Sequence, residues 1–374
     1  MVFDQPTHPR MIAPIVLSVI FFYWLAAASA QPVEILPPNF GRASQPQLTT
    51  DHQNRFLMAF GTEGKIHFTS STDASTSWTQ PVVIAQLKNL PLGMRRGPRI
   101  AQSGKTTVVT AGHAKDLWSW MSDDEGATWK SPVKINDALE SAKEALQNIA
   151  GGPNGSYFAV WLDDRVAGSM RIYGARSKDG GASWKENVKI YQSPDRHVCE
   201  CCHPSVVYGK DGKIVVMWRN WLGGARDMYI ATSVDGGKTF TPATKLGGGT
   251  WPLNACPMDG GGVALSEDGN HQTVWQRKGE VFFSGVDGAE KLLGSGRQPV
   301  IAEYDSTTLV AWQNDGILVA ESSSKTAPQK VSDKGGFPTI AALPNGDALV
   351  AWEEAGNDGT TITGYSFGAK RGKR

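Results

Sequence analysis

Three of the four cysteines in this chain of 374 residues lie within four positions, in the stretch HVCECCHPSV that begins at His197. These three are Cys199, Cys201 and Cys202. The fourth, Cys256, follows in WPLNACPMDGG. Three or four thiolates, with His203 and Met258 nearby, form a soft ligand set that suits Cu(I) or zinc. The same thiols could instead form disulfides or act in redox chemistry. The compartment of the protein and the fold around the thiols decide which of these roles applies.

The N-terminal segment carries the features of an export signal. Arg10 precedes an apolar run from Met11 to Ala28, and Ala28-Ser29-Ala30 fits a small-residue cleavage site. We therefore expect cleavage after Ala30 and a periplasmic or secreted protein, in a compartment that permits disulfides. An uncleaved anchor is the alternative, because the run is almost long enough to span a bilayer. After cleavage, no stable membrane span is expected.

Charge and composition restrict the class of protein. Lysine and arginine together number 37, against 36 aspartates and glutamates, so the chain lacks the basic excess of a nucleic-acid-binding surface. The 42 glycines and 13 tryptophans accompany aromatic and β-branched runs, which favours an all-β protein. The basic end GAKRGKR is expected to fray, and we treat residues 369–374 as a tail.

An eight-residue pattern, Ser-x-Asp-x-Gly/Ser-x-Thr/Ser-Trp/Phe, recurs four times in the chain. It occurs in SSTDASTSWT, MSDDEGATWK, RSKDGGASWK and TSVDGGKTFT. The aspartates can accept hydrogen bonds from turn amides, the glycines tolerate left-handed backbone, and the aromatic ring can cover the turn. The pattern therefore predicts tight structural turns between strands at Asp73, Asp124, Asp179 and Asp235.

These segments resemble the Asp boxes, or bacterial neuraminidase repeats, of sialidase-like β-propellers. The resemblance covers nearly the whole mature chain. It is specific for fold and weak for function, because Asp boxes also occur in other glycosidases, binding proteins and assembly factors. The stretches CECCHPSV and WPLNACPMDGGG, with the segment between them, also resemble a group of exported bacterial Asp-box proteins usually labelled sialidase-like.

The number of blades follows from a second marker, an apolar strand that begins near a proline. Such starts lie at Pro46, Pro98, Pro204, Pro257, Pro299 and Pro338, with LQNIAG at Gln147 filling the one gap. The last block shows only three strands, and PVEIL is a lone strand before the first block. We predict one propeller over residues 31–368 with seven blades, its ring closed by the N-terminal strand. Six blades, the number in sialidases proper, is the alternative.

Arginines gather on one predicted face of this propeller. The Asp boxes lie on one face, and the loops that lead into each blade, with the loops between second and third strands, lie on the other. The candidate substrate-binding residues in the latter loops are Arg96, Arg99, Arg165, Arg219, Arg226 and Arg297. Guanidinium groups bind carboxylate, sulfate and phosphate, so we expect an anionic small molecule or acidic glycan at this mouth. Alternatively, single arginines pair with local carboxylates, for example Arg165 with Asp163.

The resemblance implies three arginines on a substrate carboxylate, a Tyr–Glu nucleophile pair and an aspartate acid/base. RGPRIA distantly resembles the Arg-Ile-Pro motif of sialidases, which gives that role to Arg96 or Arg99. Candidate catalytic acids are Asp163, Asp164 and Glu353. No tyrosine falls clearly in a mouth loop, so enzymatic activity stays open. If present, it would be exo-sialidase-like glycoside hydrolysis, which requires no cofactor.

The predicted fold also places the cysteines. Their two loops lead into the fourth and fifth blades, which are neighbours, so Cys256 should lie near Cys201 or Cys202. A disulfide from Cys256 to Cys201 or Cys202 is one hypothesis, with the other two cysteines forming a second bridge. A copper or zinc site that includes His203 and Met258 is another. For the whole protein, a binding scaffold without chemistry is the alternative to acidic-glycan binding at the arginine mouth and to metal or thiol chemistry at the cysteines, and the oligomeric state stays open.

Overall fold

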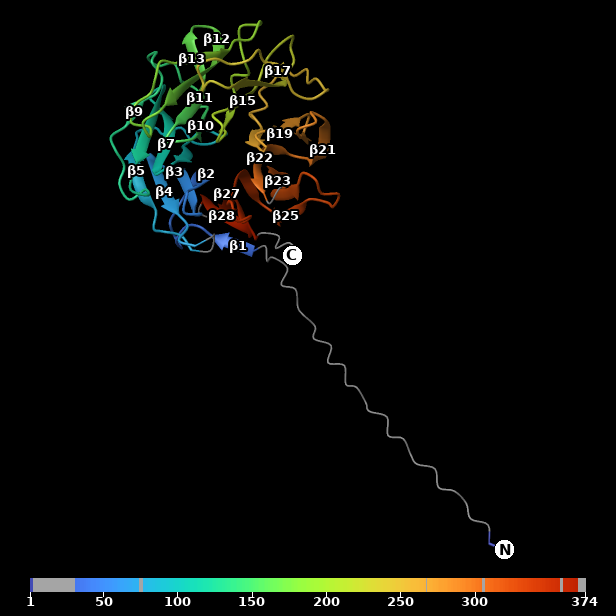
Figure 1. Ribbon diagram of the computed structural model, residues 1–374. Helices are drawn as coiled ribbons and strands as arrows, with labels where there is room; N and C mark the ends of the chain where they lie inside the picture. Colours follow the sequence, from blue (N-terminus) through green and yellow to red (C-terminus); the bar gives the residue numbers. More distant parts are fainter. Residues whose placement is uncertain (3–30, 74–76, 267, 305–306, 357–358, 369–374) are drawn as a thin grey trace.

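The computed structural model describes residues 1–2, 31–73, 77–266, 268–304, 307–356 and 359–368. Across these residues the strands form seven four-stranded antiparallel sheets, arranged as blades around one ring (Figure 1). The predicted seven-bladed propeller is confirmed, and the six-bladed alternative is wrong. The predicted signal peptide and the basic tail lie outside the described residues, apart from Met1 and Val2.

Each blade runs outward from an inner strand A to an outer strand D. Blade 1 holds β2 (Ser44–Thr50), β3 (Phe56–Thr62), β4 (Lys65–Ser70) and β5 (Val82–Gln86). Blade 2 holds β6 (Arg99–Ser103), β7 (Thr106–His113), β8 (Asp116–Ser122) and β9 (Val133–Lys134). Blade 3 holds β10 (Gln147–Gly151), β11 (Tyr157–Val166), β12 (Ser169–Ser177) and β13 (Val188–Tyr191). Blade 4 holds β14 (Ser205–Tyr208), β15 (Ile214–Arg219), β16 (Met228–Ser233) and β17 (Thr244–Lys245).

The remaining blades follow the same plan with one exception. Blade 5 holds β18 (Gly262–Leu265), β19 (His271–Arg277), β20 (Glu280–Ser284) and β21 (Glu290–Ser295). Blade 6 holds β22 (Arg297–Tyr304), β23 (Thr307–Gln313), β24 (Ile317–Glu321) and β25 (Gln329–Ser332). Blade 7 takes its inner strands from the C-terminal end and its outer strand from the N-terminal end: β26 (Gly335–Ala342), β27 (Ala348–Gly356), β28 (Gly359–Phe367) and β1 (Gln31–Glu34).

The ring closes where β1 pairs with β28, as predicted. Val33 lies opposite Gly364 and Glu34 lies opposite Thr363, in an antiparallel register. Figure 1 shows β1 at the outer edge of the last blade. The side chains of Val33 and Ile35 are buried in the core between blades 7 and 1. The N-terminal segment therefore covers an edge that would otherwise expose unpaired backbone groups.

Tryptophans on the B strands pack between neighbouring blades. The largest fully buried side chains include Trp161, Trp218, Trp275 and Trp312. Trp161 of β11, for example, packs against Leu117 and Ile135 of blade 2. A large flat ring fills the wedge-shaped space between two twisted sheets, which accounts for its repeated position in the sequence.

The Asp boxes have the structural role expected of them. In all four boxes the aspartate Oδ1 accepts a backbone N–H from the residue four positions later, at 2.9–3.0 Å. In the second box these bonds, led by that from the Thr128 hydroxyl, lower the pKa of Asp124 to about 2. Trp129 then packs on Phe68 of the preceding blade, with ring centroids 5.4 Å apart. Each box thus fixes a turn and joins two blades.

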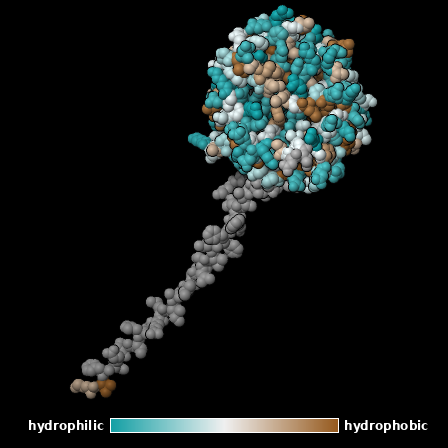
Figure 2. Space-filling model, turned by 180° about the vertical axis from the view of Figure 1, so that it is seen from behind, coloured by the Kyte–Doolittle hydropathy of each residue, from teal (hydrophilic) through white to brown (hydrophobic). Residues whose placement is uncertain are grey.

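The inner strands enclose a central channel, a cavity of about 1090 Å³ lined by residues of all seven blades. The outer surface seen in Figure 2 is mostly hydrophilic, with apolar residues scattered over it. None of the described residues forms a helix long and apolar enough to cross a membrane.

Candidate functional site

Two backbone contacts fix the cysteine loop between β13 and β14. The amide of Val198 donates to the carbonyl of Met170 at 3.0 Å, and that of Cys199 donates to the carbonyl of Arg219 at 3.0 Å. The loop is therefore tied to both blade 3 and blade 4. A turn follows, in which the amide of Cys202 faces the carbonyl of Cys199 at 3.5 Å. This turn brings three side chains from four consecutive positions back toward one point.

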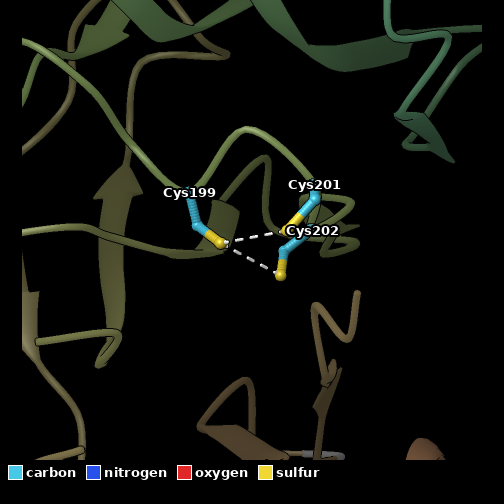
Figure 3. Close-up of side chains that lie close together, drawn as sticks. All are labelled: Cys199, Cys201 and Cys202. Atoms are coloured by element: carbon cyan, nitrogen blue, oxygen red, sulfur yellow. Dashed lines mark hydrogen bonds between the residues drawn. The ribbon is translucent and has the colours of Figure 1, made fainter. Parts of the chain in front are cut away.

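Figure 3 shows the three thiols that meet in this turn, the three-thiol cluster of Cys199, Cys201 and Cys202. The Sγ atom of Cys199 lies 3.2 Å from that of Cys202 and 3.6 Å from that of Cys201. All three side chains are buried, and Met258 packs against them. No S–S bond joins them, since such a bond is about 2.05 Å long. Buried sulfur atoms this close form a preassembled set of soft ligands.

Hydrogen bonds within the cluster, together with charged neighbours, make Cys199 the most acidic of the three thiols. The thiols of Cys201 and Cys202 hydrogen-bond to Cys199, and together with the charges of Arg219 and Arg226 they hold its pKa well below the usual range. Nη1 of Arg226 lies 3.2 Å from Sγ of Cys199. The same interaction with Cys199 raises the pKa of Cys201 to about 12. Cys199 is thus the group of the cluster that loses its proton most readily.

The fourth cysteine lies at the edge of this cluster. Cys256 belongs to the loop between β17 and β18, is exposed, and contributes to the raised pKa of Cys201. This contribution agrees with the predicted proximity of Cys256 to Cys201 or Cys202. A disulfide between them stays a prediction, because all four cysteines are present as free thiols.

His203, the predicted nitrogen ligand, lies away from the three-thiol cluster. Only sulfur atoms belong to the group of ligand atoms that lie within 4.8 Å of one another in the described part of the chain. His203 lines the central channel instead, and burial lowers its pKa well below the usual range. The candidate metal ligands brought together are the cysteines and Met258.

The predicted arginine mouth is largely engaged by the protein itself. Arg96 pairs with Glu144 at 2.9 Å. Arg165 pairs with Asp163 at 2.8 Å and stacks on Tyr173 at 4.0 Å. The alternative of local ion pairing thus describes Arg165 correctly.

The other predicted arginines fall in three different places. Arg219 donates to three backbone carbonyls at 2.7–2.9 Å, and with Arg226 it stands beside the three-thiol cluster. Arg99 is buried at the channel, whereas Arg297 begins β22 on the surface and is exposed. Binding of a ligand by these arginines stays a prediction, but the structure does not bring all six to one point.

The three candidate catalytic acids come from blades 3 and 7, which are not neighbours. Asp163 is buried and accepts bonds from Trp161 and Arg165, at 2.8 Å each. Asp164 pairs with Lys143 at 2.7 Å. Glu353 accepts two bonds from Gln45, and burial raises its pKa. These partners give each carboxyl a local structural role, and a catalytic role remains untested.

Residues 97–271 match a family model described as a BNR repeat-like domain. This stretch contains three of the four Asp boxes, and the match confirms the repeats recognised in the sequence. The structure therefore defines a seven-bladed β-propeller, part of which resembles a BNR repeat-like domain. Among curated proteins, no sequence match was found.

Several solved structures share this fold at low sequence identity. A protein of unknown function from Dyadobacter fermentans is 16% identical, with a TM-score of 0.54 over 91% of this chain and 98% of that one. YCF48 from Cyanidioschyzon merolae is 13% identical, with a TM-score of 0.54 over 91% and 99%. The intramolecular trans-sialidase from Ruminococcus gnavus is 11% identical, with a TM-score of 0.51 over 87% and 94%. Identities this low establish the fold alone.

Proposed function

We propose that this propeller binds one Cu(I) ion through the thiols of Cys199, Cys201 and Cys202. The observation that carries the proposal is the convergence of three buried Sγ atoms within 4.8 Å of one another. Sulfur ligands select soft ions, and metal–sulfur bonds of about 2.3 Å require Sγ–Sγ separations of about 4 Å in a three-coordinate site. The observed separations of 3.2 and 3.6 Å would have to widen by about 0.8 and 0.4 Å, which a change of side-chain rotamer in the turn can supply.

The charges around the cluster favour a monovalent ion. Arg219 and Arg226 stand beside the thiols, and Arg226 contacts Cys199 directly. A Cu(I) ion held by two or three thiolates has a net negative charge, which these guanidinium groups stabilise. A divalent ion would meet stronger repulsion from them. Cys199, already the most acidic thiol, is the first ligand, and binding displaces the protons of the others.

Cys256 provides a route from solvent to the buried thiols. Its side chain is exposed and contributes to the raised pKa of Cys201, whereas the three thiols of the cluster are buried. An ion that arrives from solvent meets the Cys256 sulfur first and then passes to Cys201. In this arrangement Cys256 contributes mainly to the rate of loading, and the three-thiol cluster contributes most of the affinity.

A titration under reducing, oxygen-free conditions tests the proposal. Purified mature protein competes with bicinchoninate for Cu(I), and the colour of the copper–bicinchoninate complex reports what the protein has not bound. We expect one tightly bound equivalent per chain, and a parallel titration with zinc should show weaker binding. Absence of copper binding by fully reduced protein would contradict the proposal. If zinc binds more tightly than copper, the proposed metal would be wrong but the proposed metal site would stand.

Thiol mapping of the purified protein separates this function from a structural disulfide. The proposal expects all four cysteines to react with a thiol label once copper is removed and the protein is denatured. A stable link between Cys256 and Cys201 or Cys202, formed in the folded protein before any exposure to oxidant, would favour the disulfide hypothesis instead.

A further inference from the structure

The two ends of the central channel differ in chemistry. One end is formed by the turns between A and B strands, on the face of the Asp boxes, where Lys210, Asp211 and Asp268 line the cavity. The other end, toward the cysteine loops, is lined by Arg95, Arg99 and His203. Between them lie the inner strands, with polar and apolar side chains along the wall.

Arg95 closes the channel at the end nearer the cysteine loops. It comes from the loop before blade 2, and its guanidinium donates to Gln298 of blade 6 at 2.7 and 2.9 Å. A third bond reaches the carbonyl of Pro338 in blade 7 at 2.8 Å. Gln298 is in turn held by Asp259 of the loop before blade 5, at 2.6 Å. Because these bonds connect opposite sides of the ring, the channel ends blindly here.

The second arginine at this blind end has no carboxylate partner among the described residues. Arg99 is only 2% exposed, and its guanidinium donates to the carbonyls of Gln147, Pro98 and Arg95. The charges of Asp259 and Glu353 act on Arg95, whereas the charge that acts on Arg99 is that of Arg95 itself. Burial and this repulsion lower the pKa of Arg99 to about 9. A buried charge without a counter-charge is costly, and two of its five N–H groups remain for a ligand.

His203 adds an unsatisfied polar atom at the same end. Its side chain is 6% exposed, and Nδ1 has no hydrogen-bond partner. Buried polar atoms are nearly always paired, so an unpaired one beside a cavity indicates a position for a ligand atom. Arg95, Arg99 and His203 all line the same cavity.

We propose that the blind end of the central channel binds a single oxyanion group, a carboxylate, phosphate or sulfate, through Arg99 and His203. The ligand enters from the face of the Asp boxes, opposite the mouth predicted from the sequence, and its body lies in the channel. Lys210 lies beside Asp211 and Asp268 at the opening, so the rim there carries both signs of charge and the buried arginine end provides the selection for an anion. The site is separate from the three-thiol cluster and does not depend on copper binding.

Calorimetry with three anions that share a phenyl ring and differ in the anionic group tests this site. The anions are benzoate, phenyl phosphate and phenyl sulfate, and benzyl alcohol is the neutral control. At constant ionic strength, we expect 1:1 binding of at least one anion and none of benzyl alcohol. The preferred head group identifies the ligand class. Arg99→Gln should weaken that binding at least tenfold, since charge-assisted bonds are lost. Arg277→Gln removes the same charge from an arginine paired with Glu290 and should leave affinity within twofold.

A crystal of the wild-type protein soaked in selenate locates the anion independently, which matters if Arg99→Gln does not fold. The expected anomalous peak lies between Arg99 and His203. Binding of none of the three anions, or selenate peaks confined to other places, would overturn the proposal. An Arg99→Gln variant that folds and binds the preferred anion as tightly as the wild type would overturn it as well.

Discussion

Cys199→Ser is expected to abolish retention of copper while leaving the propeller folded. Cys199 is the central thiol of the cluster, with Cys201 and Cys202 within 3.6 Å and a pKa held well below the usual range. A serine hydroxyl still fits the space and can accept the bond from Arg226, but it is a poor ligand for Cu(I). Loss of a direct ligand should exceed the 10- to 100-fold effect typical of residues that only support ligands.

Competition with bicinchoninate measures this effect, and Cys256→Ser is its matched control. Both variants make the same chemical change, one in the buried cluster and one at the exposed edge. Cys256→Ser should keep one bound copper per chain. We expect it to load copper more slowly than the wild type and to lose less affinity for copper than Cys199→Ser does. Should Cys199→Ser hold copper as tightly as the wild type, the three-thiol cluster would not be the site.

The second large effect concerns closure of the ring. Val33→Asp should destabilise the whole propeller, because Val33 is 3% exposed and packs in the core between blades 7 and 1. The substitution places a carboxylate among apolar side chains and weakens the pairing of β1 with β28 that closes the ring. We expect a loss of about 3 kcal/mol or more in the free energy of unfolding.

Urea denaturation of the two variants Val33→Asp and Glu34→Asp checks this expectation. Glu34 lies next to Val33 on the same strand, but its side chain is exposed, so the change there should shift stability by less than about 0.5 kcal/mol. Deletion of residues 31–36 should destabilise at least as much as Val33→Asp. Equal midpoints for the two point variants would show that the N-terminal strand does not hold the ring together.

The fold was predictable because its determinants are local and repeated. Each Asp box carries its own turn chemistry within eight residues, and the B-strand tryptophans recur at blade spacing. Counting seven strand starts and one unpaired N-terminal strand was therefore enough to predict both blade number and closure. The approach of Cys256 to Cys201 followed from the same reasoning, since neighbouring blades bring their leading loops together.

The arginines show where sequence reasoning ends. All six predicted binding arginines were assigned to one face, yet their roles depend on partners far away in the chain. Arg219 is held by carbonyls of residues 226, 259 and 276, and Arg95 bonds to Gln298 and Pro338. Contacts across a closed ring leave no local pattern. RRGPR signalled a concentration of charge, but not that Arg95 would close the channel and Arg99 would face it.

The most direct test of the proposed function is X-ray absorption at the copper edge of protein loaded with one equivalent of Cu(I). Fitting the extended fine structure gives the number and type of atoms bound to copper. The three-thiol cluster predicts two or three sulfur neighbours at about 2.3 Å. It also predicts that this sulfur shell is lost in Cys199→Ser. A first shell of nitrogen or oxygen atoms, or a sulfur shell unchanged by Cys199→Ser, would contradict copper binding at this cluster.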